Sequence, residues 1–310
     1  MTAPASASRR QLPRRVAGRA LRWLHDNRHR GSLPRGTTAE LVDPDSVYKP
    51  CGESALAAGM VLRVPGASAD ETRAARELLD FAWTQFGDGA LLYERQLRYP
   101  MMTDPLEVYA HFAEAGYRHD AFEELAMHLS SLVSHRAVEH MPNRRLAVAN
   151  ATRIAGMRPE ADWGALLEAT WLGQRPEPWL IDWMTAYCMT HTVFHVTNWG
   201  RQPHGLPTEV CDYLARWLPV WMEVWAEIQE WDLLGELIIV DACLPEPQCD
   251  PQMWQLLADA QHPSGLVPRD GQPLAGDAAA AYRDHHHTTA VAVMAGALAQ
   301  SRYSDAPVPS

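Results

Sequence analysis

One arrangement recurs six times along this sequence and limits what the chain can fold into. An amphipathic helical segment is followed by an apolar helical segment that ends in small residues and a glycine or a proline. The apolar segments are predicted at 50–59, 104–116, 142–156, 180–199, 231–244 and 286–300. Glycine closes helices because it adopts the left-handed C-cap conformation at little cost. Strand signals are almost absent, so the predicted fold class is all-α.

The amphipathic partners of these helices carry apolar residues at three-and-four spacing, with polar residues on the opposite face. They are predicted near 14–28, 69–86, 119–133, 161–172, 207–229 and 250–261. A repeat of about 40 to 55 residues indicates a repeat architecture. The apolar helices are expected to form an inner ring and the amphipathic ones an outer ring. Six pairs predict a closed α/α toroid around a central cavity, and an open solenoid is the alternative.

Composition places the chain among globular proteins. Of its 310 residues, 47% are hydrophobic and the net charge is −11. We expect one helical domain over 14–302, with flexible tails at 1–13 and 303–310. No apolar run approaches the roughly 20 residues that a membrane helix needs, and no apolar signal region follows the first arginines. We therefore expect a cytoplasmic protein that does not act at a membrane.

Three further features bear on the classes of partner and site. The five cysteines are odd in number and show no CxxC spacing, as expected of reduced thiols. Basic and aromatic residues are not interleaved as a nucleic-acid surface requires. No P-loop, Rossmann glycine pattern, GxSxG elbow or Cys/His nucleophile motif is present. Nucleic acid is therefore not an expected partner, and the oligomeric state is open.

The last repeat carries a family resemblance. MWQLLADAQHPSGLVPRDG, followed by DHHHTTAVAVMAGAL, resembles a repeat of the α/α toroids that include class II terpene cyclases and protein prenyltransferase β subunits. The whole chain also resembles an uncharacterised actinobacterial family associated with natural-product genes. These resemblances imply an active site in the central cavity. They also imply a small-molecule or peptide-like natural-product intermediate as the substrate.

The prenyltransferase resemblance can be examined at its zinc site, which in that family pairs an Asp-x-Cys with a later histidine in a His-Thr context. This chain offers Asp241 and Cys243 in VDACLP, and His287 in HHHTT. It departs from the family in placement, because Pro245 ends the helix directly after the Asp-x-Cys. Asp241 and Cys243 are thus expected at the opposite end of the ring from His287, which counts against this zinc site.

A different set of polar residues lies at equivalent depths of the predicted inner helices. Each predicted inner helix ends at a glycine or a proline. The residue nine positions before this terminator is a histidine or a glutamate in four of the six helices: His191, His287, Glu236 and Glu107. In the other two helices it is Pro50 or Ala147. The position five residues before the terminator adds His195 and His111. In a closed ring, equivalent positions face the cavity at similar depth. These side chains are therefore expected to meet.

His191, Glu236 and His287 come from three consecutive inner helices, and we predict that they are the catalytic residues. Two imidazoles and a carboxylate are a common ligand set of catalytic zinc and non-haem iron, so a divalent metal, zinc or iron, is the expected cofactor. His195, one turn from His191, and Glu107 are predicted as outer or alternative metal ligands. The alternative is that these residues are hydrogen-bonded struts between helices.

Other residues are candidates for binding the substrate. Tyr48, Lys49 and Glu53 lie at the predicted mouth of the first inner helix. His286 lies at a predicted helix start, where free backbone N–H groups bind anions. Three tryptophans are predicted either to line the cavity and stabilise a cation or to belong to the core: Trp179, Trp183 and Trp199. The Pro- and Gly-rich segment 262–285 is predicted to be an irregular lid.

These features favour a natural-product biosynthesis enzyme that acts on a hydrophobic small or medium substrate in a central cavity. The polar ring would supply a Lewis-acid metal or a general acid and base. One alternative is a metal-free acid/base cyclase or isomerase. The other is a non-catalytic helical binding or scaffold protein. A cyclase, a lyase and a transferase all remain open as reaction classes.

Overall fold

The computed structural model describes residues 4–40, 44–157, 161–274 and 276–305, and within these ranges the chain forms helices and no strand. This confirms the all-α prediction. All six apolar helices predicted from the sequence are present. They are α2 (Pro44–Leu62), α5 (Asp104–Glu114), α8 (Pro142–Ile154), α11 (Trp183–Val196), α13 (Trp231–Cys243) and α15 (Ala278–Asp305).

The amphipathic helices also lie where the apolar spacing predicts them. They are α1 (Pro4–Asn27), α3 (Ala69–Gln85), α6 (Asp120–Ser131), α9 (Trp163–Glu168) with α10 (Trp171–Gln174), α12 (Thr208–Glu227) and α14 (Pro251–Ala260). Shorter elements lie in the connections between these helices. These are η1 (Arg28–Gly31), α4 (Ala90–Arg98), α7 (Val133–Ala137), η2 (Pro178–Leu180) and η3 (Pro203–Gly205).

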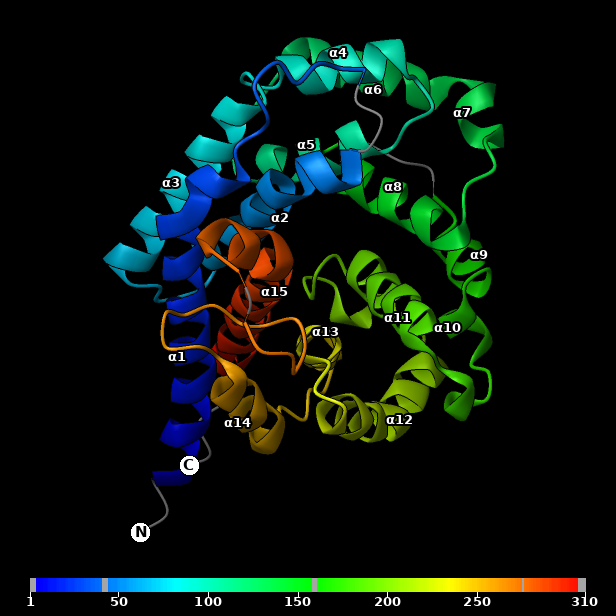
Figure 1. The fold of residues 1–310 in the computed structure, drawn as a ribbon. Coiled ribbons are helices and arrows are strands. Elements are labelled where there is room, and N and C mark those ends of the chain that lie inside the picture. Colours follow the sequence, from blue (N-terminus) through cyan, green and yellow to red (C-terminus); the bar gives the residue numbers. More distant parts are fainter. Residues whose placement is uncertain (1–3, 41–43, 158–160, 275, 306–310) are drawn as a thin grey trace.

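The apolar helices follow one another in space as they do in the chain. Each of α2, α5, α8, α11 and α13 contacts the next apolar helix, and α15 returns to contact α2 (Figure 1). The amphipathic helices pack outside them, with α3 against α2, α12 against α13 and α1 against α15. Side chains at corresponding heights of the apolar helices can therefore approach one another.

Contacts between helix ends show that neighbouring apolar helices run in the same direction. Arg153, in the last turn of α8, donates to the carbonyl oxygen of His195 at the end of α11. Arg63 and Arg201 follow the ends of α2 and α11, and both form ion pairs with Glu114, the last residue of α5. The carboxyl ends of these helices therefore meet on one side of the molecule.

Helix α13 is the most enclosed element. Every one of its residues is buried, including three acidic ones, Asp232, Glu236 and Asp241. Its close packing on α15 depends on Gly235, where an added Cβ atom would lie 2.7 Å from Cγ1 of Val291. A buried carboxylate is costly unless it is paired or hydrogen-bonded. The partners of these acids therefore indicate what the centre of the fold is built for.

Three boundaries differ from the predictions. Helix α1 begins at Pro4, so residues 4–13 are helical and not a tail. Helix α15 begins at Ala278, eight residues before the predicted start, because Asp277 accepts hydrogen bonds from the amides of Ala279 and Ala280 and caps it. At the other end, α15 continues to Asp305, and residues 306–310 lie outside the described residues. No helix within the described ranges is both long and apolar enough to span a membrane.

The segment predicted to be a lid is anchored in its first half. Leu266 and Val267 are buried, and the amide of Val267 donates to Oγ1 of Thr289 on α15. The carbonyl oxygen of Arg269 accepts from the amide of Asp232, at the start of α13. The first half of this connection therefore packs on the interior of α15 and holds the amino end of α13.

Candidate metal centre

The site is built on two carboxylates of α13. Asp232 and Glu236 are four residues apart, so their side chains project from the same face of the helix. Their side chains are 3% and 2% exposed. Asp232 lies in the first turn, where the free N–H groups of a helix favour a negative charge. Two acids held this deeply and this close together require cationic or hydrogen-bonding partners.

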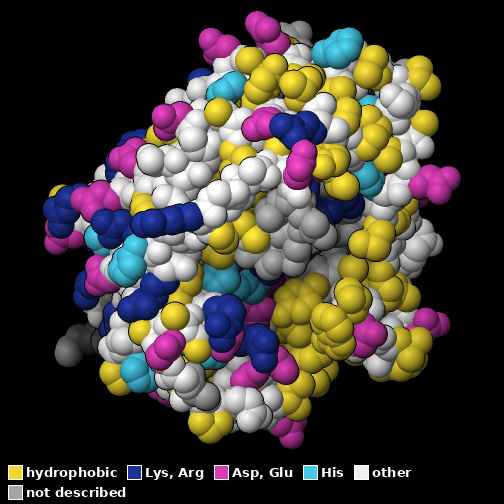
Figure 2. Space-filling view, turned by 45° about the horizontal axis from the view of Figure 1, so that its top comes forward, with side chains coloured by type: hydrophobic (Ala, Val, Ile, Leu, Met, Phe, Trp, Pro, Cys, Tyr) yellow, Lys and Arg dark blue, Asp and Glu magenta, His cyan; other side chains and the backbone are white. Residues whose placement is uncertain are grey.

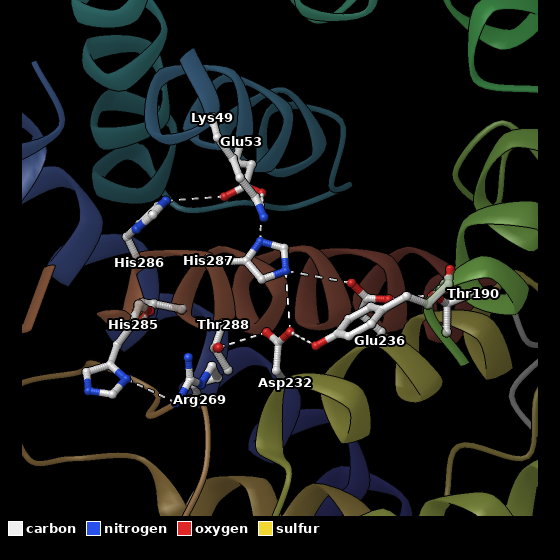
Figure 3. A network of polar contacts seen from close by, with 12 residues as sticks. Lys49, Glu53, Thr190, Asp232, Glu236, Arg269, His285, His286, His287 and Thr288 are labelled. Carbon is white, nitrogen blue, oxygen red and sulfur yellow. Dashed lines mark hydrogen bonds and ion pairs between the residues drawn. The ribbon is translucent and has the colours of Figure 1, made fainter. Parts of the chain in front are cut away.

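His287 of α15 lies between these acids and α2. Its Nε2 atom lies 3.4 Å from Oδ2 of Asp232 and 3.7 Å from Oε1 of Glu236 (Figure 3). Its Nδ1 atom lies 2.6 Å from Oε1 of Glu53 on α2. One ring therefore connects three carboxylates from two other helices.

Helix α11 supplies the remaining partners of the two acids, together with α15. The hydroxyl of Tyr187 donates to Oδ2 of Asp232 at 2.5 Å, and that of Thr190 donates to Oε2 of Glu236 at 2.5 Å. Thr288 of α15 donates to Oδ1 of Asp232 at 2.7 Å. The Nε2 atom of His191 lies 3.6 Å from Oε1 of Glu236. These hydroxyl groups fix the carboxylates while leaving Oε1 of Glu236 facing both imidazoles.

The charged groups at the site determine which of its imidazoles and carboxylates carry a proton. Burial alone would lower the pKa of His287, but the carboxylates of Glu53 and Asp232, with Glu236, raise it well above its usual value. Burial would raise the pKa of Glu53, but the neighbouring imidazoles of His287 and His286 lower it well below its usual value. The pKa of Glu236 is also lowered, because His191 and His287 outweigh its burial. Without a metal, an imidazolium thus lies among three carboxylates.

The spacing of the ligand atoms would allow them to share one ion. Ligand atoms of Asp232, Glu236 and His287 all lie within 4.8 Å of one another, and these residues could hold a metal. The distances of 3.4, 3.6 and 3.7 Å at the imidazole Nε2 atoms lie near or beyond the limit of a hydrogen bond. Two ligands at 2.0–2.2 Å from one tetrahedral ion lie about 3.3–3.6 Å apart. The donor set also suits zinc or ferrous iron.

The structure brings together His191, Glu236 and His287, as the matching depths on the predicted helices led us to expect. Sequence reasoning missed Asp232. Its spacing of four from Glu236 in WDLLGE was the available signal. Glu53 was predicted to contact the substrate, but its Oε1 atom is occupied by Nδ1 of His287. Glu53 therefore orients the His287 ring.

Two other predicted substrate contacts surround Glu53. The Nζ atom of Lys49 lies 3.6 Å from Oε1 of Glu53 and the Lys49 side chain is 46% exposed. The Nε2 atom of His286 lies 3.5 Å from Oε2 of Glu53, and its Nδ1 atom lies 3.0 Å from the carbonyl oxygen of Tyr282 (Figure 3). Because α15 begins at Ala278, His286 lies inside the helix, so the predicted anion site at a helix start is wrong.

The two outer ligands predicted from the sequence do not reach the carboxylates of α13. Glu107 pairs with Arg144 of α8 at 2.7 Å. The His195 ring centroid lies 6.1 Å from that of His191, one turn further into the molecule. Burial and the nearby His191 hold the pKa of His195 well below its usual value. Burial, only partly offset by Glu114, lowers the pKa of His111 to about 4. Two neutral imidazoles thus lie in the interior beyond the carboxylates.

Two aromatic residues predicted to contact the substrate lie away from this site. Tyr48 is 1% exposed, and its ring packs edge-on against Phe86. Trp199 stacks on Phe194 beyond the carboxyl end of α11. Trp179 and Trp183 are instead 74% and 58% exposed, near the amino end of α11. Of the three tryptophans, only these two lie at the end of α11 that carries Tyr187 and His191.

Asp241 and Cys243 do not join His287, in agreement with the departure seen in the sequence. The carboxylate of Asp241 accepts hydrogen bonds from the amides of Gln248 and Cys249. Cys243 lies two helical turns beyond Glu236, about 10 Å along the axis of α13. Asp241 therefore holds the turn after α13.

Comparison with known proteins was made once this geometry was established. The model of DUF6895, a domain of unknown function, matches residues 17–297. This chain belongs to that family. No curated protein and no solved structure matches the chain. The matched range spans all of the residues at the candidate metal centre of this chain.

Proposed function

We propose that this DUF6895 protein is a metal-dependent enzyme in which Asp232, Glu236 and His287 bind zinc or iron. The observation that carries the proposal is the set of distances from the imidazole Nε2 atoms to the buried carboxylates, which suits ligands of one ion. Three protein ligands leave a coordination position for water or substrate, as in catalytic sites. The excess of negative charge at the site also favours a cation.

The metal would act as a Lewis acid and would lower the pKa of a bound water to about 7. The remaining residues then have distinct roles. Glu53 accepts the Nδ1 proton of His287 and so directs Nε2 towards the carboxylates. Tyr187 and Thr190 hold those carboxylates. His191, whose side chain is 45% exposed and lies beside Glu236, would pass protons between a metal-bound water and solvent.

We further propose that the six helical pairs form an α/α toroid and that the metal lies in its central cavity. The cyclic order of contacts among the apolar helices and their common direction support this arrangement. The substrate is a natural-product intermediate with a hydrophobic part, as the resemblance to biosynthetic toroid proteins implies. A lyase or cyclase reaction that begins by polarising a substrate oxygen suits a Lewis acid beside a proton carrier.

Metal analysis of the purified protein tests this proposal. We expect one equivalent of zinc or iron in the natural protein and in Glu107→Gln, whose carboxylate pairs with Arg144. Asp232→Asn, Glu236→Gln and His287→Ala should lose the metal while remaining folded by circular dichroism. A natural protein that remains without metal after incubation with zinc or ferrous iron would contradict the proposal.

A metal-free acid/base cyclase or isomerase is the second candidate, and one observation favours it. The three carboxylates raise the pKa of His287, so this ring is protonated at neutral pH and able to donate a proton. Such an enzyme would retain its activity after treatment with a chelator, whereas the metal enzyme would lose it. A binding or scaffold protein would show no turnover in either state.

A further inference from the structure

Four aromatic rings form a continuous line along one face of α11. Trp183, Tyr187, His191 and His195 follow one another at intervals of four residues, with ring centroids 6.2, 6.4 and 6.1 Å apart. Residues at this spacing share one side of a helix. The line starts at Trp183, which is 58% exposed, and passes the candidate metal ligands before it ends in the interior. It therefore connects the surface to the site.

The outer end of this line lies in an exposed apolar surface, here called the mouth patch. It comprises Trp179, Leu180, Trp183 and Met184, with Val220 and Val224 of α12 and Ile228 directly after it, all between 45% and 74% exposed. A hydrogen bond from Trp221 of α12 to the carbonyl oxygen of Pro178 joins the two segments. Figure 2 shows hydrophobic side chains gathered beside histidine and acidic side chains on this face.

Contiguous apolar patches on the surface of soluble proteins often mark binding sites. A buried aromatic side chain covers ~150–250 Å2, and Trp179 and Trp183 leave more than half of theirs exposed. Trp183 lies eight residues before His191, so the two are about 12 Å apart along the helix axis. A hydrocarbon chain of moderate length spans that distance.

We propose that the substrate is an amphiphile whose polar group binds the metal and whose apolar chain lies on the mouth patch. This inference rests on the metal function proposed above. The aromatic ring of Tyr187 covers the path between the two sites, while its hydroxyl is bound to Asp232. The hydrophobic part of the substrate therefore lies at the surface.

The charges around the patch disfavour two other occupants. Asp182, Glu223 and Glu227 are exposed between its apolar residues. A second copy of the chain would bring the same acids together, and an anionic bilayer would also be repelled. An uncharged hydrocarbon chain meets neither penalty.

Alkyl hydroxamates test this inference, since the hydroxamate group binds zinc or iron and the chain can be varied independently. Acetohydroxamate and octanohydroxamate would be titrated into the metal-loaded protein by calorimetry. Burial of a methylene tightens binding by about fourfold, and half-burial by about twofold. If four of the six additional methylenes are half-buried, octanohydroxamate should bind about 16-fold more tightly.

Two double variants test where the hydrocarbon chain of octanohydroxamate binds. In W179S/W183S, octanohydroxamate should bind less than about threefold more tightly than acetohydroxamate, while the affinity for acetohydroxamate stays unchanged. In M127S/V133S, which alters exposed apolar residues of α6 and α7, the full difference in affinity should remain. The inference is overturned if octanohydroxamate binds the natural protein no more tightly than acetohydroxamate does. It is also overturned if the full difference in affinity remains in W179S/W183S.

Two results separate this inference from the proposed function. If acetohydroxamate binds neither the natural protein nor its variants after incubation with metal, the metal site itself fails. If acetohydroxamate binds but chain length has no effect, only the substrate assignment fails. Sedimentation that shows a dimer of the natural protein, dissociated in W179S/W183S, would assign the patch to self-association and overturn the inference.

Discussion

The Nδ1 atom of His287 lies 2.6 Å from Oε1 of Glu53, while the Nε2 atom of the same ring faces Oδ2 of Asp232 at 3.4 Å. One nitrogen is thus fixed by α2 and the other is presented to α13. A carboxylate in this position sets the tautomer of a metal-binding histidine and raises its basicity. The contact also links the first apolar helix to the last, so the pair that orients His287 lies where α2 packs against α15.

Replacing Glu53 by Gln should weaken metal binding without removing a ligand. The amide keeps the size and an acceptor oxygen of the carboxylate but loses its charge, so His287 becomes a poorer donor. Loss of such a partner reduces metal affinity by about 10–100-fold, and we expect the lower end. Competition with a chromophoric chelator measures the change. Glu107→Gln should leave the affinity unaltered, and an unaltered affinity in Glu53→Gln would show that Glu53 does not act through His287.

The metal-free protein should lose stability at alkaline pH through His287. Its folded-state pKa is raised well above the ordinary value near 6.5, so the proton binds the folded state more tightly than the unfolded one. This contribution is complete below the unfolded pKa and disappears as pH rises through the raised pKa. Urea unfolding at pH 7 to 10 should show a steeper loss in the natural protein than in His287→Gln. His204→Gln, which alters an exposed histidine, should behave like the natural protein.

Metal affinity should increase with pH, whereas the stability of the metal-free protein should decrease. A metal at Nε2 displaces the proton that the raised pKa holds on the ring, so binding releases a proton and tightens as pH increases. Titration of zinc in buffers with different ionisation enthalpies measures the released proton. Binding without proton release at pH 7 would place the metal away from His287.

Tyr187→Phe should destabilise the metal-free protein by about 1.5–3 kcal/mol, because a buried carboxylate loses a hydrogen bond of the charge-assisted kind. The phenol donates to Asp232 at 2.5 Å, and Asp232 is 3% exposed. Tyr213→Phe is the matched control, since its hydroxyl donates to the neutral carbonyl oxygen of Pro176 at 2.7 Å. That loss should cost about 0.5–1.5 kcal/mol. Equal costs in urea unfolding would mean that the Asp232 contact is not charge-assisted.

The helices were predictable because their signals are local. Apolar spacing and glycine C-caps determine where α5 and α8 end, with Gly116 and Gly156 in the left-handed region directly after them. The same rule was wrong for Gly296, which lies inside α15. Gly296 lies where α15 packs closely on α1, a segment that is distant in the sequence. The spacing of residues along the chain does not show which helices approach closely.

The site was predictable only in part, for a related reason. His191, Glu236 and His287 came from matching depths on helices that run in the same direction, which a repeat pattern implies. Asp232 stayed hidden because its importance comes from Tyr187, Thr288 and His287, all far away in the chain. Glu53 was noticed at the mouth of its helix, but its pairing with His287 joins residues 234 positions apart. Tertiary contacts of this kind leave no periodic signal.

Gly296 itself provides the last prediction. An added Cβ atom would lie 2.5 Å from Cβ of Ala17 and 2.7 Å from the carbonyl oxygen of Pro13, so α1 would have to move away from α15. Overpacking of this kind costs about 1–3 kcal/mol. The cost should outweigh the gain of up to about 1 kcal/mol that alanine brings to a helix interior. Gly296→Ala should therefore unfold at lower urea concentration than the natural protein.

Gly59→Ala in α2 is the matched control for this change. The nearest atom to its added Cβ is Nη1 of Arg63 at 3.8 Å, an ordinary contact with a flexible side chain. This variant should keep the helix-propensity gain and be stabilised by about 0.5–1 kcal/mol. Opposite signs in the two variants would show that Gly296 is needed for close packing of α1 on α15. Stabilisation by both changes would contradict the close contact between the two helices.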